Sequence, residues 1–480
     1  MLQINKIHKI DALQGLKQLE SNSIDLIVSD SPYQLDSTRE RFGKKGSAEA
    51  KYGTDGAFQR ASKGFMGKEW DVLPEVDVLK ECLRVIKAGA FSFWLMTPRQ
   101  DSQAEFITRL KQAGFNIGFT PLYWAYASGF PKAGNIGKMV DKRMGAEREV
   151  IGKKESGIGK AFNKGQWRSE SEEVDITTPQ AKALDGSYAG FQPKPAVEVI
   201  IVAMKPLTEK TYVEQALKNN KGITWLDDVR IPYVSDGDRE NSKVGFIDGL
   251  KCNTYMEESL YNRKEDYKPQ QGRFPANLLV SDDVLNDGSV TKSTTTSSVG
   301  GWGTTTFNNN RDEVDGLKIS YERGHNDSGS FSRYFDLDKW HINKLPDSVK
   351  KTFPFMIVPK ASSGEKNDGL NEFEGKYMDE SREIGSAGGC NPRNRGAETE
   401  RKNFHPTVKP TKLMEYLITL GSREGDIVLD CFAGSGTTAI ASRILTRNFI
   451  CFERDAEYHK IAEARIKDYM EQTKLTEMIK

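Results

Sequence analysis

The sequence predicts an α/β protein with a mostly parallel sheet. Two observations lead to this fold class. Short apolar runs of strand length alternate with helical patterns near both ends of the chain, and the periodicity weakens between them. The middle of the chain therefore reads as an insertion, with predicted boundaries at 1–205, 206–352 and 353–480.

The N-terminal part supplies strands and helices in alternation. Apolar runs predict buried strands at 24–28, 90–96 and 197–204. Helical spacing predicts helices at 76–86 and 104–113, and Gly89 and Gly114 follow them as helix-ending residues. One or two further strands are expected within 116–126.

The C-terminal part repeats the alternation more regularly. Pro410 stands where a helix begins, because proline is tolerated in the first turn. The predicted elements after it are helix, strand, helix, strand and helix, at 411–420, 427–430, 436–446, 449–453 and 456–474.

Composition excludes several classes of protein. The 69 basic and 68 acidic residues balance, so a nucleic-acid partner would have to be met by a local patch. The five cysteines form no CxxC pair, which argues against a zinc ribbon or a disulfide scaffold and fits a reducing compartment. We expect no metal site. No apolar run approaches the roughly 20 residues that span a bilayer, and the start lacks a secretory h-region, so an intracellular, soluble protein is expected.

The strongest motif is a glycine-rich turn between a strand and a helix. The segment 428–438 reads VLDCFAGSGTT: an acid ends the strand, and two glycines allow a tight turn and close approach to a ligand. It matches neither GxGxxG nor a Walker A loop. Glu453 ends the next strand, 23 residues after Asp430, where an acid can bind ribose hydroxyls. An ordinary strand–helix turn is the alternative, but the order of elements favours a nucleoside cofactor. The candidate cofactor-binding residues here are Asp430, Phe432, Ala433, Gly434, Ser435, Gly436, Thr437, Thr438 and Glu453.

A second motif follows the first buried strand. Asp30, Ser31, Pro32 and Tyr33 combine a carboxylate, a backbone carbonyl and an aromatic ring. The two acceptors can bind an NH2 group and the ring can stack on a planar base, at the carboxyl end of a strand where α/β proteins bind ligands. A proline turn with a capping aspartate is the alternative.

Two further segments are candidates for ligand contacts. His405–Pro410 (HPTVKP) lies just upstream of the glycine-rich turn, where His405 and Lys409 could close over a cofactor carboxylate. Residues 132–168 carry ten basic and four acidic residues, which suits contacts with phosphates, although most such runs are solvated faces.

Together these motifs resemble those of the DNA amino-methyltransferases that use S-adenosylmethionine. Asp30–Tyr33 is similar to their DPPY motif, Phe432–Thr438 to FxGxG, and His405–Pro410 to HPTxKP. The catalytic motif precedes the cofactor motif, as in the beta group of bacterial and phage enzymes. The resemblance implies a circularly permuted, Rossmann-like class I methyltransferase sheet with an inserted target-recognition domain at 206–352.

The resemblance also implies a role for each motif. Asp30 and the Ser31 carbonyl would hold the target amine, with Pro32 between them and Tyr33, which would stack the flipped base. The glycine-rich turn would wrap the methionine part of the cofactor and Glu453 would hold its ribose. Thr407 and Lys409 would touch its carboxylate end. Ser31 replaces the family's first proline, which reduces backbone rigidity.

The implied activity is methyl transfer to the exocyclic N6 of adenine in double-stranded DNA. An Asp-led tetrapeptide favours adenine, and N4 of cytosine is the alternative. Other readings are a methyltransferase acting on RNA, a catalytically impaired DNA-binding homologue and, from the glycine turn alone, a nucleotide-dependent oxidoreductase. A homodimer and a restriction endonuclease are further candidate partners, in the cytoplasm of a bacterial or phage-infected cell.

Overall fold

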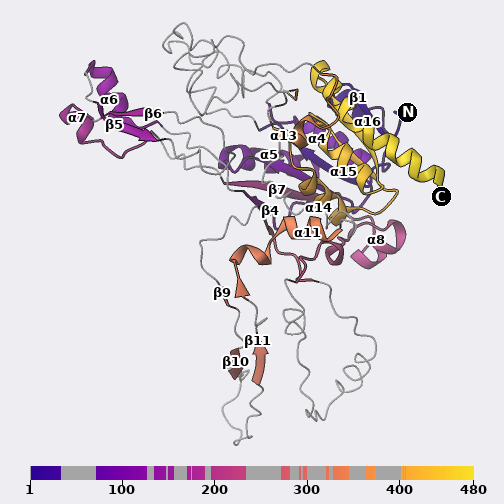
Figure 1. Ribbon diagram of the computed structural model, residues 1–480. Helices are drawn as coiled ribbons and strands as arrows, with labels where there is room; N and C mark the ends of the chain where they lie inside the picture. Colours follow the sequence, from indigo (N-terminus) through magenta and orange to yellow (C-terminus); the bar gives the residue numbers. More distant parts are fainter. Residues whose placement is uncertain are drawn as a thin grey trace, which may run out of the picture. The chain divides into compact units, whose positions relative to one another are not determined.

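A computed structural model of the 480-residue chain shows a mixed α/β protein (Figure 1). The structure describes residues 2–33, 72–126, 134–146, 150–155, 170–174, 176–189, 196–233, 272–281, 291–292, 296–299, 320–323, 328–344, 363–373, 402–403, 405 and 407–479. The chain divides into two compact units. One consists of Met1–Ile223 with Pro359–Lys480, and the other is Thr224–Val358.

The first unit is built on a sheet whose strands run in the order β1-β14-β13-β2-β3-β7-β4. Their bounds are Lys6–Lys9 (β1), Asn448–Glu453 (β14), Ile427–Asp430 (β13), Leu26–Asp30 (β2), Phe91–Met96 (β3), Val197–Met204 (β7) and Leu122–Ala125 (β4). The strands from β1 to β3 are parallel, whereas β7 is antiparallel to both β3 and β4. The central pair, β13 and β2, joins segments from opposite ends of the sequence.

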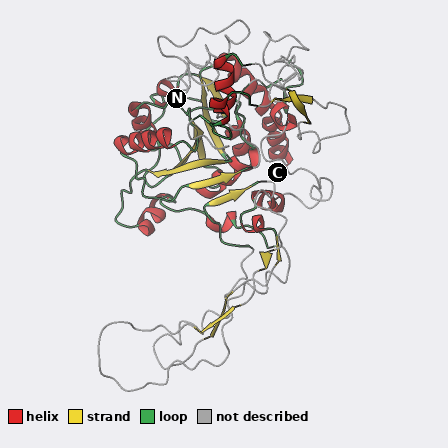
Figure 2. Cartoon of the chain, turned by 90° about the vertical axis from the view of Figure 1, so that its left-hand side faces the viewer, coloured by secondary structure: helices red, strands yellow, loops and turns green. Residues whose placement is uncertain are grey.

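Helices cover both faces of this sheet (Figure 2). On one face lie α1 (Ala12–Leu16), α4 (Val76–Val85) and α5 (Gln100–Ala113); on the other lie α14 (Thr411–Gly421), α15 (Thr437–Ile444) and α16 (Ala456–Ile479). The alternation along β14 shows why two layers form. Ile450 and Phe452 pack with the first set of helices, whereas Phe449 and Cys451 pack with α15 and α16.

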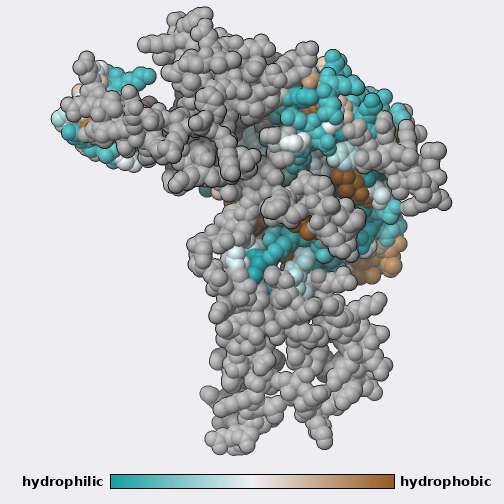
Figure 3. Space-filling model, in the orientation of Figure 1, coloured by the Kyte–Doolittle hydropathy of each residue, from teal (hydrophilic) through white to brown (hydrophobic). Residues whose placement is uncertain are grey.

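Smaller elements complete the first unit. They are α6 (Ile136–Met144), β5 (Val150–Glu155), β6 (Glu170–Val174), α7 (Pro179–Lys182), α8 (Tyr212–Asn219) and α13 (Ser363–Asn367). Thr211 and Glu214 form a capping box that starts α8. Val213 and Leu217 of this helix are exposed. Figure 3 shows hydrophobic surface in the region where Figure 1 places α8.

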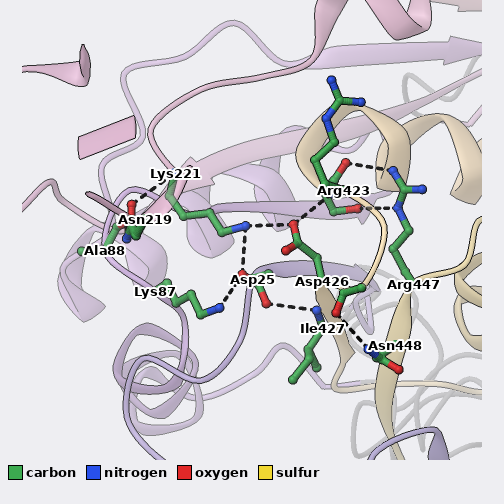
Figure 4. A network of polar contacts seen from close by, with 12 residues as sticks. Asp25, Lys87, Ala88, Asn219, Lys221, Arg423, Asp426, Ile427, Arg447 and Asn448 are labelled. Atoms are coloured by element: carbon green, nitrogen blue, oxygen red, sulfur yellow. Dashed lines mark hydrogen bonds and ion pairs between the residues drawn. The ribbon is translucent and has the colours of Figure 1, made fainter. Parts of the chain in front are cut away.

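A buried charge network closes the amino ends of the two central strands (Figure 4). The Lys221 ammonium lies 2.9 Å from Asp25, just before β2, and 2.9 Å from Asp426, just before β13. Lys87 pairs with Asp25 at 2.6 Å, and Asp25 also accepts a hydrogen bond from the Ile427 amide. The network lies at the amino-terminal ends of β2 and β13, so it holds the two strands together without occupying their carboxyl-terminal ends.

The second unit consists of short elements. They are η3 (Leu226–Val229), β8 (Leu278–Val280), β9 (Thr291–Lys292), β10 (Thr296–Val299), β11 (Ser320–Arg323), β12 (Ser328–Gly329), η4 (Phe331–Tyr334) and α11 (Leu337–Lys344). Trp340 is buried and donates its indole N–H to the Asp228 carbonyl. The Arg273 guanidinium lies 4.9 Å from the centre of the Tyr334 ring.

Candidate active site

Three acids end three neighbouring parallel strands. Asp30 ends β2, Asp430 ends β13 and Glu453 ends β14. Because these strands are adjacent and parallel, their carboxyl ends meet at one edge of the sheet, which is where α/β proteins bind ligands. The two strongest sequence motifs, almost 400 residues apart in the chain, therefore lie side by side.

Asp430 stabilises the glycine-rich turn through hydrogen bonds to its carboxylate. One carboxylate oxygen accepts hydrogen bonds from Ser29 Oγ at 2.5 Å and the Phe432 amide at 3.0 Å. The other accepts from Thr438 Oγ1 at 2.6 Å. The carboxyl is buried, which raises its pKa, and these donors oppose that shift. Asp430 thus ties β2, the turn and the start of α15 together.

The turn itself depends on two glycines in the left-handed region. Gly434 has φ +52° and Gly436 has φ +80°, values that L side chains rarely adopt. A Cβ added at Gly434 would lie 2.6 Å from His405 Nε2. The His405 ring packs edge-on against Tyr458, with centroids 4.6 Å apart. His405 therefore lies directly against the turn, and only glycine leaves room for it.

The remaining turn residues are held by the surrounding backbone and by one buried cation. Ala433 N donates to the Phe452 carbonyl, and Phe432 packs against the core cluster. Arg465 of α16 donates to the Ser435 carbonyl at 2.6 Å and also contacts Thr437 Oγ1. Sequence reasoning missed Arg465, because nothing distinguishes it from the other basic residues of an amphipathic helix.

Glu453 reaches back to the same turn. It accepts hydrogen bonds from the Gly434 amide at 2.8 Å and the Asp455 amide at 2.7 Å, one on each oxygen. Burial raises its pKa to about 7, against the opposing effect of those two amides. Each oxygen keeps a lone pair, so the carboxylate can still accept hydrogen bonds from a ligand's hydroxyl groups.

A second polar cluster surrounds Asp30. The Lys409 ammonium lies 2.8 Å from Asp30 Oδ2, and Tyr33 OH donates to Asp30 Oδ1 at 3.0 Å. Lys409 also donates to Tyr33 OH at 3.0 Å. Ser31 is buried, and Pro32 carries the chain on to Tyr33. Two of the four residues of the predicted catalytic motif, Asp30 and Tyr33, therefore contact Lys409.

The charged groups of this cluster shift one another's pKa values. Burial raises the pKa of Asp30 to about 6, with Glu198 adding to the shift and Lys409 opposing it. Burial acts to lower the pKa of Lys409, but the negative charges of Asp30 and Glu198 outweigh it and hold that pKa well above its usual value. At neutral pH the cluster holds a carboxylate beside a buried ammonium.

The HPTVKP segment splits between the two clusters. His405 lies at the glycine turn, whereas Lys409 pairs with Asp30 and not with a group of the turn. The Thr407 amide donates to His405 Nδ1 at 3.4 Å. Pro406 lies outside the described residues, as do residues 132–133, 147–149 and 156–168 of the basic stretch, of which α6 and β5 are described.

Within the described ranges, no group of three or more His, Cys, Asp or Glu residues could hold a metal ion. Nor does any described helix combine the length and apolarity needed to cross a membrane.

Cys82 and Cys431 are free, buried thiols whose sulfur atoms lie 3.6 Å apart.

The class of protein follows from this fold, this site and a family comparison. The model of the N6/N4 DNA methylases, described as DNA methylase, matches residues 24–464. The chain belongs to this family.

Individual relatives match only in part. Type II methyltransferase M2.DpnII of Streptococcus pneumoniae is 46% identical over 63 residues, covering 13% of this chain and 24% of the relative. M.HinfI of Haemophilus influenzae is 37% identical over 87 residues, or 18% of this chain and 24% of the relative. M1.MboII of Moraxella bovis is 54% identical over 57 residues, or 12% and 22%. The chain thus aligns with about a quarter of the length of these curated relatives.

Among solved structures, the cytosine-N4-specific PvuII DNA methyltransferase aligns at 11% identity with a TM-score of 0.37, covering 98% of this chain and 92% of that one. The M1.HpyAVI–SAM complex aligns at 13% identity with a TM-score of 0.32, covering 96% and 98%.

Proposed function

We propose that this chain is a DNA methyltransferase that uses S-adenosylmethionine to methylate the exocyclic N6 of adenine in double-stranded DNA. One observation carries the proposal. The Asp30 carboxylate, held by Tyr33 and Lys409, ends the strand next to the one that leads into the glycine-rich turn. A site for an amine and a site for a nucleoside cofactor therefore adjoin.

The residues of the turn suit the cofactor. Glycine at 434 and 436 brings bare backbone to the sheet edge, and Glu453 offers two carboxylate oxygens where ribose hydroxyls would donate. Phe432 to Thr438 would enclose the methionine part, with His405 and Thr407 above it. When bound, S-adenosylmethionine supplies a methyl group activated by a sulfonium centre.

The Asp30 cluster suits a planar amine. An exocyclic amine is a poor nucleophile because its lone pair is delocalised into the ring. Hydrogen bonds to the Asp30 carboxylate and the Ser31 carbonyl favour a pyramidal nitrogen whose lone pair is free to react. The Tyr33 ring offers a surface on which the base can stack. The base must leave the duplex first, since its amine is otherwise paired.

The choice of target base and the partners are separate parts of the proposal. An aspartate at position 30 favours adenine, and N4 of cytosine stays the alternative, because the family includes both activities by name. We propose the region 206–352 as the target-recognition domain. The Type II relatives support a role beside a restriction endonuclease, and a homodimer is a further prediction.

The test is transfer of a labelled methyl group to unmethylated genomic DNA, followed by digestion to nucleosides and mass spectrometry. We expect N6-methyldeoxyadenosine. N4-methyldeoxycytidine would keep the mechanism and reverse the choice of base. Labelled RNA but unlabelled DNA would contradict the proposal, and so would no product from any nucleic acid with cofactor bound.

A further inference from the structure

Glu198 is an acid of the Asp30 cluster that no sequence motif marks. It lies near the start of β7, where Trp124 of β4 is its register partner. Its carboxylate approaches the Lys409 ammonium to 3.3 Å, while Asp30 and Tyr33 lie 2.8 and 3.0 Å from the same nitrogen. One buried cation is therefore shared by two carboxylates from different strands.

The two carboxylates hold Lys409 unequally. Asp30 Oδ2 forms the shorter pair, whereas Glu198 Oε2 is buried and, among the described residues, has no hydrogen-bond partner despite its ion pair. A buried acceptor without a hydrogen bond raises the free energy of the folded protein, so a closer approach of the Lys409 ammonium to Glu198 would lower it. The flexible four-carbon stem of lysine allows its ammonium to move between the two carboxylates.

Asp30 is crowded before any substrate arrives. Its Oδ1 accepts from Tyr33 and its Oδ2 faces Lys409, so an amine N–H that binds either oxygen shares it with a donor already there, and at Oδ2 that donor carries a positive charge. If Lys409 simply left, a buried cation would lose its partner, which is strongly unfavourable. A second carboxylate within 3.3 Å avoids that loss.

We propose that Glu198 is a positioning residue that takes over the Lys409 ammonium when a target amine hydrogen bonds to Asp30. This inference rests on the proposed function. The exchange keeps the ammonium in the site, so that Asp30 stays ionised while one of its oxygens is released. Among the described residues, the charged and titratable groups that face the exchange are Asp30, Tyr33, Lys409, Glu198 and Tyr126, whose pKa burial and Glu198 raise to about 12.

The kinetic test compares Glu198→Gln with Glu198→Asp in single-turnover methyl transfer. Glutamine attracts the ammonium less, so Lys409 stays on Asp30. We expect the rate to fall about 10- to 100-fold, the range given by loss of one charged hydrogen bond. Cofactor affinity should not change. Glu198→Asp keeps the charge and should recover part of the rate; a rate no higher than that of Glu198→Gln contradicts the inference.

The matched control and the pH profile separate this role from a general structural one. Glu209→Gln removes another glutamate that pairs with a lysine, Lys218, away from the cluster, and should leave the rate unchanged. Glu198 contributes to the raised pKa of Asp30, so Glu198→Gln should displace the acid limb of the profile to lower pH. An unchanged rate and profile in Glu198→Gln would overturn the inference.

A second measurement needs no turnover. In a double-mutant cycle of Glu198→Gln and Lys409→Met, unfolding equilibria should show coupling of about tenfold, because the two side chains share a buried ion pair. Additive effects would mean that Glu198 does not hold Lys409. If the cycle shows coupling but the wild-type protein methylates no nucleic acid, the contact between Glu198 and Lys409 is real and the proposed function is overturned.

Discussion

Ser29 Oγ donates a 2.5 Å hydrogen bond to the Asp430 carboxylate, and this contact joins the ends of two strands that lie 401 residues apart in sequence. Ser29 directly precedes Asp30, and Asp430 directly precedes the glycine-rich turn. This buried bond adds to the pairing of β2 with β13 and fixes the residue proposed to hold the substrate beside the loop proposed to hold the cofactor. We therefore expect different effects from changes in the Asp30 cluster and changes in the glycine-rich turn.

Changing Asp30 should remove catalysis while sparing cofactor binding. Asp30→Asn keeps the shape of the side chain but loses the charge that Lys409 and the target amine require. We expect single-turnover methyl transfer to fall at least about 100-fold, as for loss of a group that acts on the reacting atoms. Calorimetry should give a cofactor dissociation constant within about threefold of wild type. A large loss of cofactor affinity would place Asp30 at the cofactor instead.

Changing Glu453 should have the opposite effect. Glu453→Gln keeps one acceptor oxygen and weakens charged hydrogen bonds to ribose, so the cofactor dissociation constant should rise about 10-fold, and more in Glu453→Ala. The turn is also anchored by Glu453 through Gly434 N, so circular dichroism should verify the fold of each variant. Equal cofactor affinity in wild type and Glu453→Ala would remove this residue from the site.

The pH dependence should show two different limbs. Asp30 acts as a carboxylate and its pKa is raised to about 6, so kcat/KM for DNA should fall as the pH drops below about 6. The pKa of Glu453 is raised to about 7, and its protonation removes acceptors, so cofactor affinity should weaken below about pH 7. A kcat/KM for DNA that stays constant from pH 8 to 5 would contradict the assignment of Asp30.

Gly434→Ala should damage the cofactor turn for two reasons that can be separated. The new Cβ would meet His405 Nε2 at 2.6 Å, and the backbone has φ +52°. Relief of the clash by His405→Ala should restore only part of the cofactor affinity, because the left-handed conformation still costs about 1 kcal/mol. Full affinity in the single Gly434→Ala variant would show that neither constraint operates.

The network in Figure 4 predicts a stability effect without a catalytic one. Lys221→Met leaves the buried Asp25 with the Lys87 ammonium and the Ile427 amide, and should lower the free energy of unfolding by about 3 kcal/mol, with wild-type turnover at low temperature. Lys218→Met removes a lysine from an exposed pair and should cost under about 1 kcal/mol. Urea unfolding of both variants measures the difference.

The same network sets an acid dependence of stability. Burial acts to raise the pKa of Asp25, but Lys221 and Lys87 outweigh it and hold the pKa below its usual value. The unfolded chain therefore binds this proton more tightly than the folded one. The resulting stability is present above the unfolded-state pKa of about 4 and is lost as the pH falls through the folded-state value.

Sequence patterns predicted the strands whose side chains are buried on both faces. The runs at 197–204 and 427–430 coincide with β7 and β13. A continuous apolar run of that length is typical of a strand that is covered on both faces of a sheet. They did not predict β1, in which Ile7 is the buried apolar residue of a strand with exposed lysines at its ends. A short edge strand leaves too little pattern to detect.

The site shows a similar division. Glycines, prolines and acids at strand ends leave local signals, so Asp30, Gly434 and Glu453 could be chosen from the sequence. Glu198 and Arg465 act through tertiary contacts with residues more than 25 positions away, and an acid in a strand or a base in a helix carries no such signal. The pairing of Lys409 with Asp30 likewise required the fold.

The position of β13 in the middle of the sheet has a consequence for how the protein is made. β2 leaves the ribosome early, yet its neighbour β13 follows about 400 residues later, which at typical synthesis rates is roughly 20 to 80 s. For that time one edge of the nascent sheet lacks its partner and its buried apolar face lacks cover. Folding of the sheet centre is therefore a late event dominated by long-range contacts, so the chain should depend on chaperones more than its balanced composition would indicate.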